Sequence, residues 1–110
     1  MGAMAPTLQD FKAELFRTLA NPVRIRILEA LREAGSLTVG EIQQRVGLEP
    51  SNVSQHLGIL RGHGLVATRR EGTSIRYSID APDLFQLLDV ARAIFEKQLI
   101  AQTRALEAPG

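Results

Sequence analysis

Both histidines of this chain, His56 and His63, lie in one short stretch that reads EPSNVSQHLGILRGHGLV and runs from Glu49 to Val66. Imidazole nitrogen is a common zinc ligand, so the pair raises the question of a metal site. In a continuous helix, seven residues separate two side chains by about 10.5 Å along the axis, which is too far for both to bind one ion. Glu49 is the only carboxylate of the stretch. We therefore predict no metal site here, with His63 in a turn and His56 on the surface of a helix or half-buried.

The same stretch carries small polar side chains that suit nucleic acid. If Val53, Leu57 and Leu60 pack inward at the i, i+4 and i+7 positions of a helix, its polar residues face outward. Asn and Gln can form paired hydrogen bonds with adenine, and Ser can bond to several bases or to phosphate. We expect this helix to enter the major groove of DNA. The predicted recognition residues are Ser51, Asn52, Ser54, Gln55, His56 and Arg61.

Positive charge follows directly after this helix. Residues 51–79 hold four arginines and one glutamate, a net charge of +3, although the whole chain carries only +1. Alternation on both sides of the segment EGTS predicts a β-hairpin with Gly72 in its loop. Such a hairpin can reach the neighbouring phosphate backbone or the minor groove, where Arg is favoured. The predicted hairpin contacts are Arg69, Arg70, Thr73 and Arg76, and further backbone contacts are expected from Gln43, Gln44 and Arg45.

The rest of the chain supplies the elements that hold these side chains. Apolar periodicity predicts helices over about residues 7–20, 22–34, 38–46, 50–62 and 82–106, with a short strand near residues 36–37. Cap signals agree, because Asn21 precedes a proline, Thr38 and Glu41 have capping-box spacing, and glycines follow two helices. The expected fold is mainly α with a β-hairpin wing (α+β). Its order, α-α-(β)-α-α-β-β-α, is the winged helix-turn-helix plan.

Composition narrows the possible functions. A length of 110 residues, with 45% hydrophobic and 23% charged residues, is typical of one folded domain spanning 1–110. The absence of cysteine excludes disulfides and thiolate metal sites. No apolar run is long enough to cross a bilayer, so we expect a cytoplasmic protein without a membrane partner. No nucleophile elbow and no phosphate-binding glycine motif is present, so we predict that the chain is not an enzyme.

The segments LFRTLANPVRIRILEAL, SNVSQHLGILRGHGLV and RREGTSIRYSI resemble the ArsR/SmtB family of bacterial winged-helix repressors over about residues 11–100. The resemblance implies a homodimer built from the first and last helices, which presents two recognition helices to a two-fold operator in double-stranded DNA. Residues 37–47 lack the Cys pair of many members, and the last helix lacks His. The chain is thus similar to cysteine-free actinobacterial members, and we expect a repressor with no metal or other cofactor. The implied dimer residues are Leu8, Phe11, Leu15, Leu84, Leu88, Ala91, Phe95 and Leu99.

Two other functions stay open. A winged-helix protein-interaction module would dock an acidic partner on its basic hairpin, but it would need apolar anchors on the helix over residues 50–62, where Ser, Asn and Gln prevail. A repressor that responds to a metal or a small ligand would need an atypical site between subunits. The mid-helix Gly58 is a separate puzzle, since glycine there costs about 1 kcal/mol. We expect it to allow close packing against a neighbouring helix.

Overall fold

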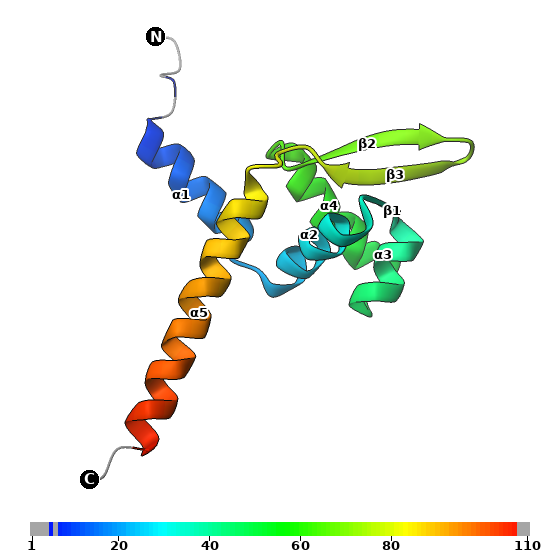
Figure 1. Ribbon diagram of the computed structural model, residues 1–110. Helices are drawn as coiled ribbons and strands as arrows, with labels where there is room; N and C mark the ends of the chain where they lie inside the picture. Colours follow the sequence, from blue (N-terminus) through cyan, green and yellow to red (C-terminus); the bar gives the residue numbers. More distant parts are fainter. Residues whose placement is uncertain (1–4, 6, 108–110) are drawn as a thin grey trace.

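The computed structural model describes residue 5 and residues 7–107, which form five helices and three strands (Figure 1). The helices are α1 (Leu8–Leu19), α2 (Pro22–Ala34), α3 (Val39–Val46), α4 (Pro50–Gly62) and α5 (Leu84–Glu107). The strands are β1 (Ser36–Thr38), β2 (Val66–Glu71) and β3 (Ser74–Ile79). This order confirms the predicted mainly α, winged helix-turn-helix class. The wing is the hairpin Val66–Ile79, made of β2, β3 and the turn between them.

Local signals set most helix boundaries where the sequence predicts them. The side-chain oxygen of Asn21 accepts a hydrogen bond from the Val23 amide at 2.9 Å, and so caps α2 ahead of its N-terminal proline. Thr38 and Glu41 form the predicted capping box of α3, with bonds of 3.0 and 3.2 Å. Gly47 ends α3 with a positive φ of 72°, a conformation that favours glycine.

One cap was not predicted, and one boundary differs from the prediction. A second capping box, between Thr7 and Asp10, starts α1, although the sequence prediction had not included it. The last helix begins at Leu84 and not at Pro82, because residues 82–83 form a turn before the helical hydrogen bonds begin. Neither difference changes which elements are present.

The core lies where α2, α3 and α4 pack together against the sheet. Val53, Leu57 and Leu60 of α4 are fully buried, as their spacing predicts. They meet Ile27, Leu28 and Leu31 of α2 and Ile42 of α3 in one apolar cluster. The sheet is antiparallel with strand order β1-β3-β2. Leu37 and Val66 are its buried residues.

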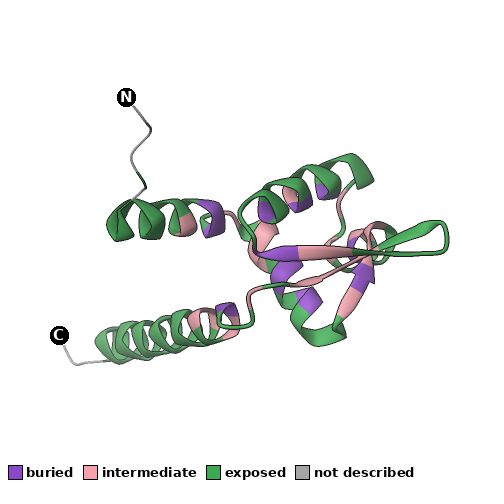
Figure 2. Cartoon of the chain, turned by 90° about the horizontal axis from the view of Figure 1, so that it is seen from above, coloured by how far each residue is buried: buried purple, intermediate pink, exposed green. Residues whose placement is uncertain are grey.

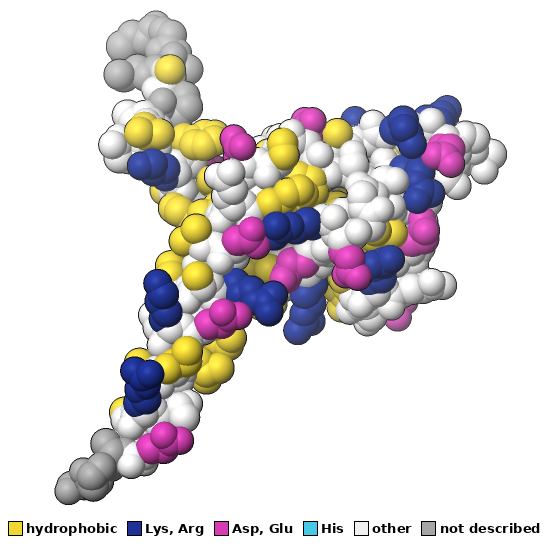
Figure 3. Space-filling view, viewed as in Figure 1, with side chains coloured by type: hydrophobic (Ala, Val, Ile, Leu, Met, Phe, Trp, Pro, Cys, Tyr) yellow, Lys and Arg dark blue, Asp and Glu magenta, His cyan; other side chains and the backbone are white. Residues whose placement is uncertain are grey.

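Helices α1 and α5 leave this body on the same side and are exposed along most of their length (Figure 2). Only Thr18 and Leu19 of α1, and Leu84 of α5, are buried. The radius of gyration is 17.6 Å, whereas a compact domain of this length would have about 13 Å. Figure 3 shows hydrophobic side chains along both helices. The chain therefore presents apolar helical surface that its own core does not cover.

The base of α5 is fixed to α2 by an ion pair. The two terminal guanidinium nitrogens of Arg32, Nη1 and Nη2, donate to the carboxylate of Asp89 at 2.6 and 2.9 Å. The Arg32 guanidinium also lies 4.8 Å from the centre of the Phe85 ring, within the range of a cation–π contact. These contacts orient α5 where it leaves the core. Among the described residues, no helix combines the length and the apolarity needed to cross a membrane.

Candidate nucleic-acid interface

Helix α4 presents its predicted polar face to solvent. Ser51, Asn52, Ser54 and Gln55 are all exposed, because the three buried residues of α4 lie on the opposite side. Arg61 is also exposed, in the last turn of the helix. Glu49 stands at the N-cap of α4 but makes no side-chain cap bond, so its carboxylate is free at the start of the helix. The exposed face thus offers short hydrogen-bonding groups at its N-terminal half.

His56 is half-buried at the edge of this face and bonds to α2. Its Nδ1 accepts a hydrogen bond from Nε of Arg24 at 3.3 Å, and the same guanidinium donates to the carbonyl of Thr18 at 3.0 Å. Burial, followed by the charge of Arg24, holds the pKa of His56 below its ordinary value. The neutral ring thus links α4 to α2 and to the end of α1. No sequence pattern predicted this partner, which lies 32 positions away.

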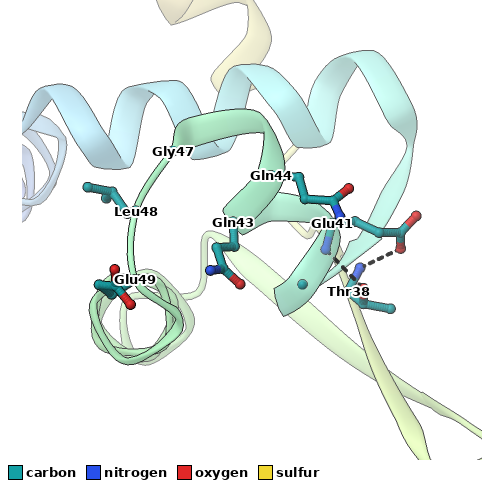
Figure 4. Close-up of a pocket in the computed structure, with 8 residues that line it drawn as sticks. Thr38, Glu41, Gln43, Gln44, Gly47, Leu48 and Glu49 are labelled. Atoms are coloured by element: carbon teal, nitrogen blue, oxygen red, sulfur yellow. Dashed lines mark hydrogen bonds between the residues drawn. The ribbon is translucent and has the colours of Figure 1, made fainter.

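The turn between α3 and α4 forms a hollow of about 630 Å³ beside the start of α4. Figure 4 shows Gln43 pointing into it, with Leu48 and Glu49 on the far wall. Gln43 and Gln44 both line this hollow and so lie near the predicted recognition helix. Arg45 instead lines a second hollow between α2 and α3, together with Arg26 and Glu33. The three predicted backbone contacts therefore lie on two different sides of α3.

The wing places its arginines on two faces. Arg69 pairs across the hairpin with Arg76, whereas Arg70 pairs with Ile75. Because neighbouring residues of a strand point to opposite faces, Arg69 and Arg76 share one face and Arg70 lies on the other. Arg69, Arg70 and Thr73 are exposed, and Thr73 lies in the turn at the tip. Arg76 differs, since it is mostly covered and bonds to β1.

Gly58 does not pack against a helix, contrary to the expectation. A Cβ atom built at this position would meet nothing within 4 Å, and the residue is exposed. Seven residues after Ser51 and three after Gln55, it lies on the outward, polar face of α4. Packing inside the chain therefore does not require a glycine at this position.

The comparisons with known proteins agree with this geometry. Residues 19–69 match the family model described as a helix-turn-helix domain. The HTH-type transcriptional regulator Rv0081 of Mycobacterium tuberculosis is 52% identical over 101 residues, which cover 91% of this chain and 88% of that protein. Its crystal structure superimposes with a TM-score of 0.81 at 50% identity and covers 90% of this chain and 99% of the other.

A second solved structure indicates the family to which the chain belongs. It is the homodimeric winged helix-turn-helix DNA-binding domain of Mycobacterium bovis Mb0332, a possible ArsR-family transcriptional regulator, with a TM-score of 0.76 at 29% identity and coverage of 90% and 94%. The biofilm growth-associated repressor of Xylella fastidiosa is 39% identical over 78% of this chain and 77% of its own length. The chain belongs to the ArsR-type winged helix-turn-helix transcriptional regulators.

In this ArsR-type regulator, the described residues contain no group of three or more His, Cys, Asp or Glu side chains placed to hold a metal ion. His63 is 3.6 Å from a carboxylate oxygen of Glu14, and its Nδ1 lies 2.9 Å from the Ile59 carbonyl. It follows the last residue of α4, in the predicted turn. The two histidines therefore have separate partners and belong to different local networks.

The apolar residues predicted for a dimer divide into two sets. Leu84 is buried in the core of this ArsR-type chain, and Leu15 and Leu88 pack against that core. The more distal residues are open, with Phe11 60% and Phe95 62% exposed. The exposed apolar surface therefore lies further along α5 than the prediction placed it. Its large side chains are Leu8, Phe11, Phe16, Val90, Ile94, Phe95, Leu99, Ile100 and Leu106.

Proposed function

We propose that this ArsR-type regulator acts as a single-domain homodimer that binds a two-fold operator in double-stranded DNA and represses transcription by occluding a promoter. The observation that carries the proposal is the polar outward face of α4 next to an arginine-bearing wing. In this arrangement Ser51, Asn52, Ser54 and Gln55 read base edges in the major groove. Gln43, Gln44 and Arg61 hold the backbone beside α4.

The exposed apolar surface of α1 and α5 supports the dimer. Helix α5 has 24 residues, about 36 Å of helix, yet only its first two turns contact the core. Side chains such as Phe95 and Leu99 are about half exposed or more, which is costly for apolar groups in water. A second copy offers a surface of the same kind across a two-fold axis. The homodimeric domain of the M. bovis protein provides a structural precedent.

The positive charge of the wing also supports DNA binding. Arg69 and Arg70 lie on opposite faces of a thin hairpin and can approach phosphates on both sides of a narrow groove. Thr73, at the tip, adds a hydroxyl donor for a phosphate oxygen. No metal or small-molecule cofactor is needed for this binding, because all proposed contacts come from side chains of the two protomers.

The direct test is selection of bound duplexes from a random DNA pool, followed by affinity measurement on the selected sequence. We expect a palindromic sequence with half-sites about 34–36 Å apart and an affinity that falls steeply with salt. A reporter gene behind the selected sequence should be expressed less when the protein is present. Absence of any preferred duplex, or an affinity that does not change with salt concentration, contradicts the proposal.

Single substitutions refine that test. Gln55→Ala should relax the preference at particular base positions of the selected sequence, because one paired hydrogen bond is lost. Gln86→Ala is the matched control, since Gln86 is an exposed glutamine on α5 and away from α4. Equal loss of preference in both variants argues against α4 as the reading element. Addition of zinc or of a chelator should leave the affinity of the wild-type protein unchanged.

A further inference from the structure

Arg76 lies where the sheet narrows from three strands to two. Strand β1 pairs with β3 from Ser36 opposite Ser78 to Thr38 opposite Arg76. Beyond that point, residues 74–75 of β3 pair only with β2. A free two-stranded ribbon is marginally stable in water, so the direction of the wing tip depends on what holds its base. From the core toward the tip of the wing, Arg76 is the last residue of β3 that pairs with both β1 and β2.

The Arg76 guanidinium bonds to the body of the protein. Its Nε donates to Oγ of Ser36 at 3.0 Å, and one of its NH₂ groups donates to the carbonyl of the same residue at 3.2 Å. That NH₂ group also lies 3.5 Å from a carboxylate oxygen of Glu41 at the start of α3. Its Nε lies 3.9 Å from the carboxylate of Glu71 at the end of β2. One side chain therefore joins β1, α3 and both strands of the wing.

The charge of Arg76 is already balanced inside the protein. The side chain is 25% exposed, whereas that of its cross-strand neighbour Arg69 is 75% exposed. Two carboxylates flank Arg76, and two hydrogen bonds from its guanidinium go to Ser36. A phosphate contact would require breaking these bonds, whereas Arg69 would give up only one exposed contact, with the Glu71 carboxylate at 3.4 Å. The two arginines therefore suit different tasks, although they lie side by side on the same face of the wing.

We propose that Arg76 is a positioning residue, which clamps the base of the wing to Ser36 and Glu41 so that Arg69, Arg70 and Thr73 meet DNA in a fixed orientation. This inference rests on the proposed function for its effect on DNA binding. Its structural part, the clamp, concerns the free protein. Arg76 differs in role from the exposed wing residues, because it acts through the wing and not on a phosphate.

The clamp is tested first without DNA, by hydrogen exchange of the backbone amides of residues 70–75. In Arg76→Gln these amides should exchange about tenfold faster than in the wild type, as expected when one charge-assisted hydrogen-bond set is lost. Arg76→Lys should behave similarly, because an ammonium cannot match the planar fork that contacts Ser36 and the carboxylates together. Ser36→Ala, which changes no charge, should have a smaller effect of the same kind. Arg69→Gln should leave the exchange unchanged.

DNA affinity then separates positioning from charge. Arg104→Lys is the control, because Arg104 is an exposed arginine in the last turn of α5 and outside the proposed DNA contacts, so it should keep the affinity within about twofold. Arg76→Lys keeps the same net charge but should weaken binding about tenfold, the equivalent of one charge-assisted hydrogen bond. Glu41→Gln removes a negative charge, so simple electrostatics predicts tighter binding, whereas loss of the clamp predicts weaker binding. Thermal unfolding of each variant establishes that it is folded.

The outcomes distinguish this inference from the proposed function. Wild-type affinity of Arg76→Lys, or unchanged amide exchange in the Arg76 and Ser36 variants, overturns the clamp. Tighter binding by Glu41→Gln also overturns it. If the wild-type protein selects no DNA, the proposed function fails, while the exchange measurement still decides whether Arg76 holds the wing. Faster exchange together with weaker binding in Arg76→Lys supports both.

Discussion

Replacement of Gly58 by alanine should make the protein more stable and its DNA binding weaker. Glycine in a helix interior is less favourable than alanine by about 0.8–1.0 kcal/mol, and Gly58 lies in the middle of α4. A Cβ atom at this position would meet nothing within 4 Å in the chain, so no steric cost offsets the gain. We expect Gly58→Ala to raise the free energy of unfolding by about 1 kcal/mol. For a domain of this size the melting temperature should rise by about 4 °C.

The effect on DNA binding follows from the side of α4 on which Gly58 lies. It shares the outward face of α4 with Ser51 and Gln55, so a missing side chain lets the helix backbone lie close to the groove. Overpacking a well-fitted contact by a methyl group costs about 1–3 kcal/mol, which is about a fivefold to 150-fold loss of affinity. Gly58→Gln should be worse for binding, because its side chain is longer. Both variants should remain more stable than the wild type, since Gln is also a good helix former.

The measurements are thermal or denaturant unfolding of the free protein and fluorescence anisotropy with the selected duplex. Stability and affinity should change in opposite directions, and the loss of affinity should grow from Ala to Gln. If both variants bind like the wild type while they gain stability, close approach of DNA at Gly58 is refuted. If neither gains stability, the assumed cost of the mid-helix glycine is refuted.

Three further predictions follow from other parts of the structure. Arg69→Ala combined with Arg70→Ala removes four arginines from the proposed dimer, so binding to all duplexes should weaken. The slope of log affinity against log salt, measured by salt titration, should flatten by up to about 3.6, and an unchanged slope rules out phosphate contacts. Phe95→Asp should dissociate the proposed dimer in analytical ultracentrifugation, because each copy loses about 1.5–3 kcal/mol of apolar burial, and a dimer of unchanged affinity excludes α5 from the interface. The third concerns His56, whose folded pKa is lowered by burial and by Arg24. The unfolded chain then binds more protons as the pH falls below about 6.5, so the free energy of unfolding should decrease there, and His56→Gln should remove this part of the pH dependence in denaturant titrations.

Much of the fold could be predicted because its signals are local. The caps at Asn21, Thr38 and Gly47 depend on residues within four positions, and each was confirmed. The inward face of α4 follows from a spacing that any helix turns into one side, and Val53, Leu57 and Leu60 are indeed buried. For the same reason the exposed polar face of α4 followed from the sequence. Which of its residues touch DNA stays a prediction.

The networks around the predicted site could not be read from the sequence. Arg24 meets His56 across 32 positions, and Arg76 meets Ser36 across 40. Nothing in the residue types distinguishes Arg76 from Arg69, yet one is largely covered and the other is open. The difference arises because β1 pairs with β3 and ends at the level of Arg76. Only that register brings Ser36 and Glu41 to one arginine.

The apolar stripe of α5 likewise shows what the sequence determines and what the packing decides. Periodicity determined that Leu84, Leu88, Phe95 and Leu99 share one face of a helix, because 3.6 residues make one turn. It did not determine what each of them touches. The tertiary structure places Leu84 in the core and leaves Phe95 and Leu99 exposed, because the body of the protein ends after the second turn of α5. The sequence thus determined the elements and their faces, whereas the packing of distant segments decided which faces are filled and which remain open for another molecule.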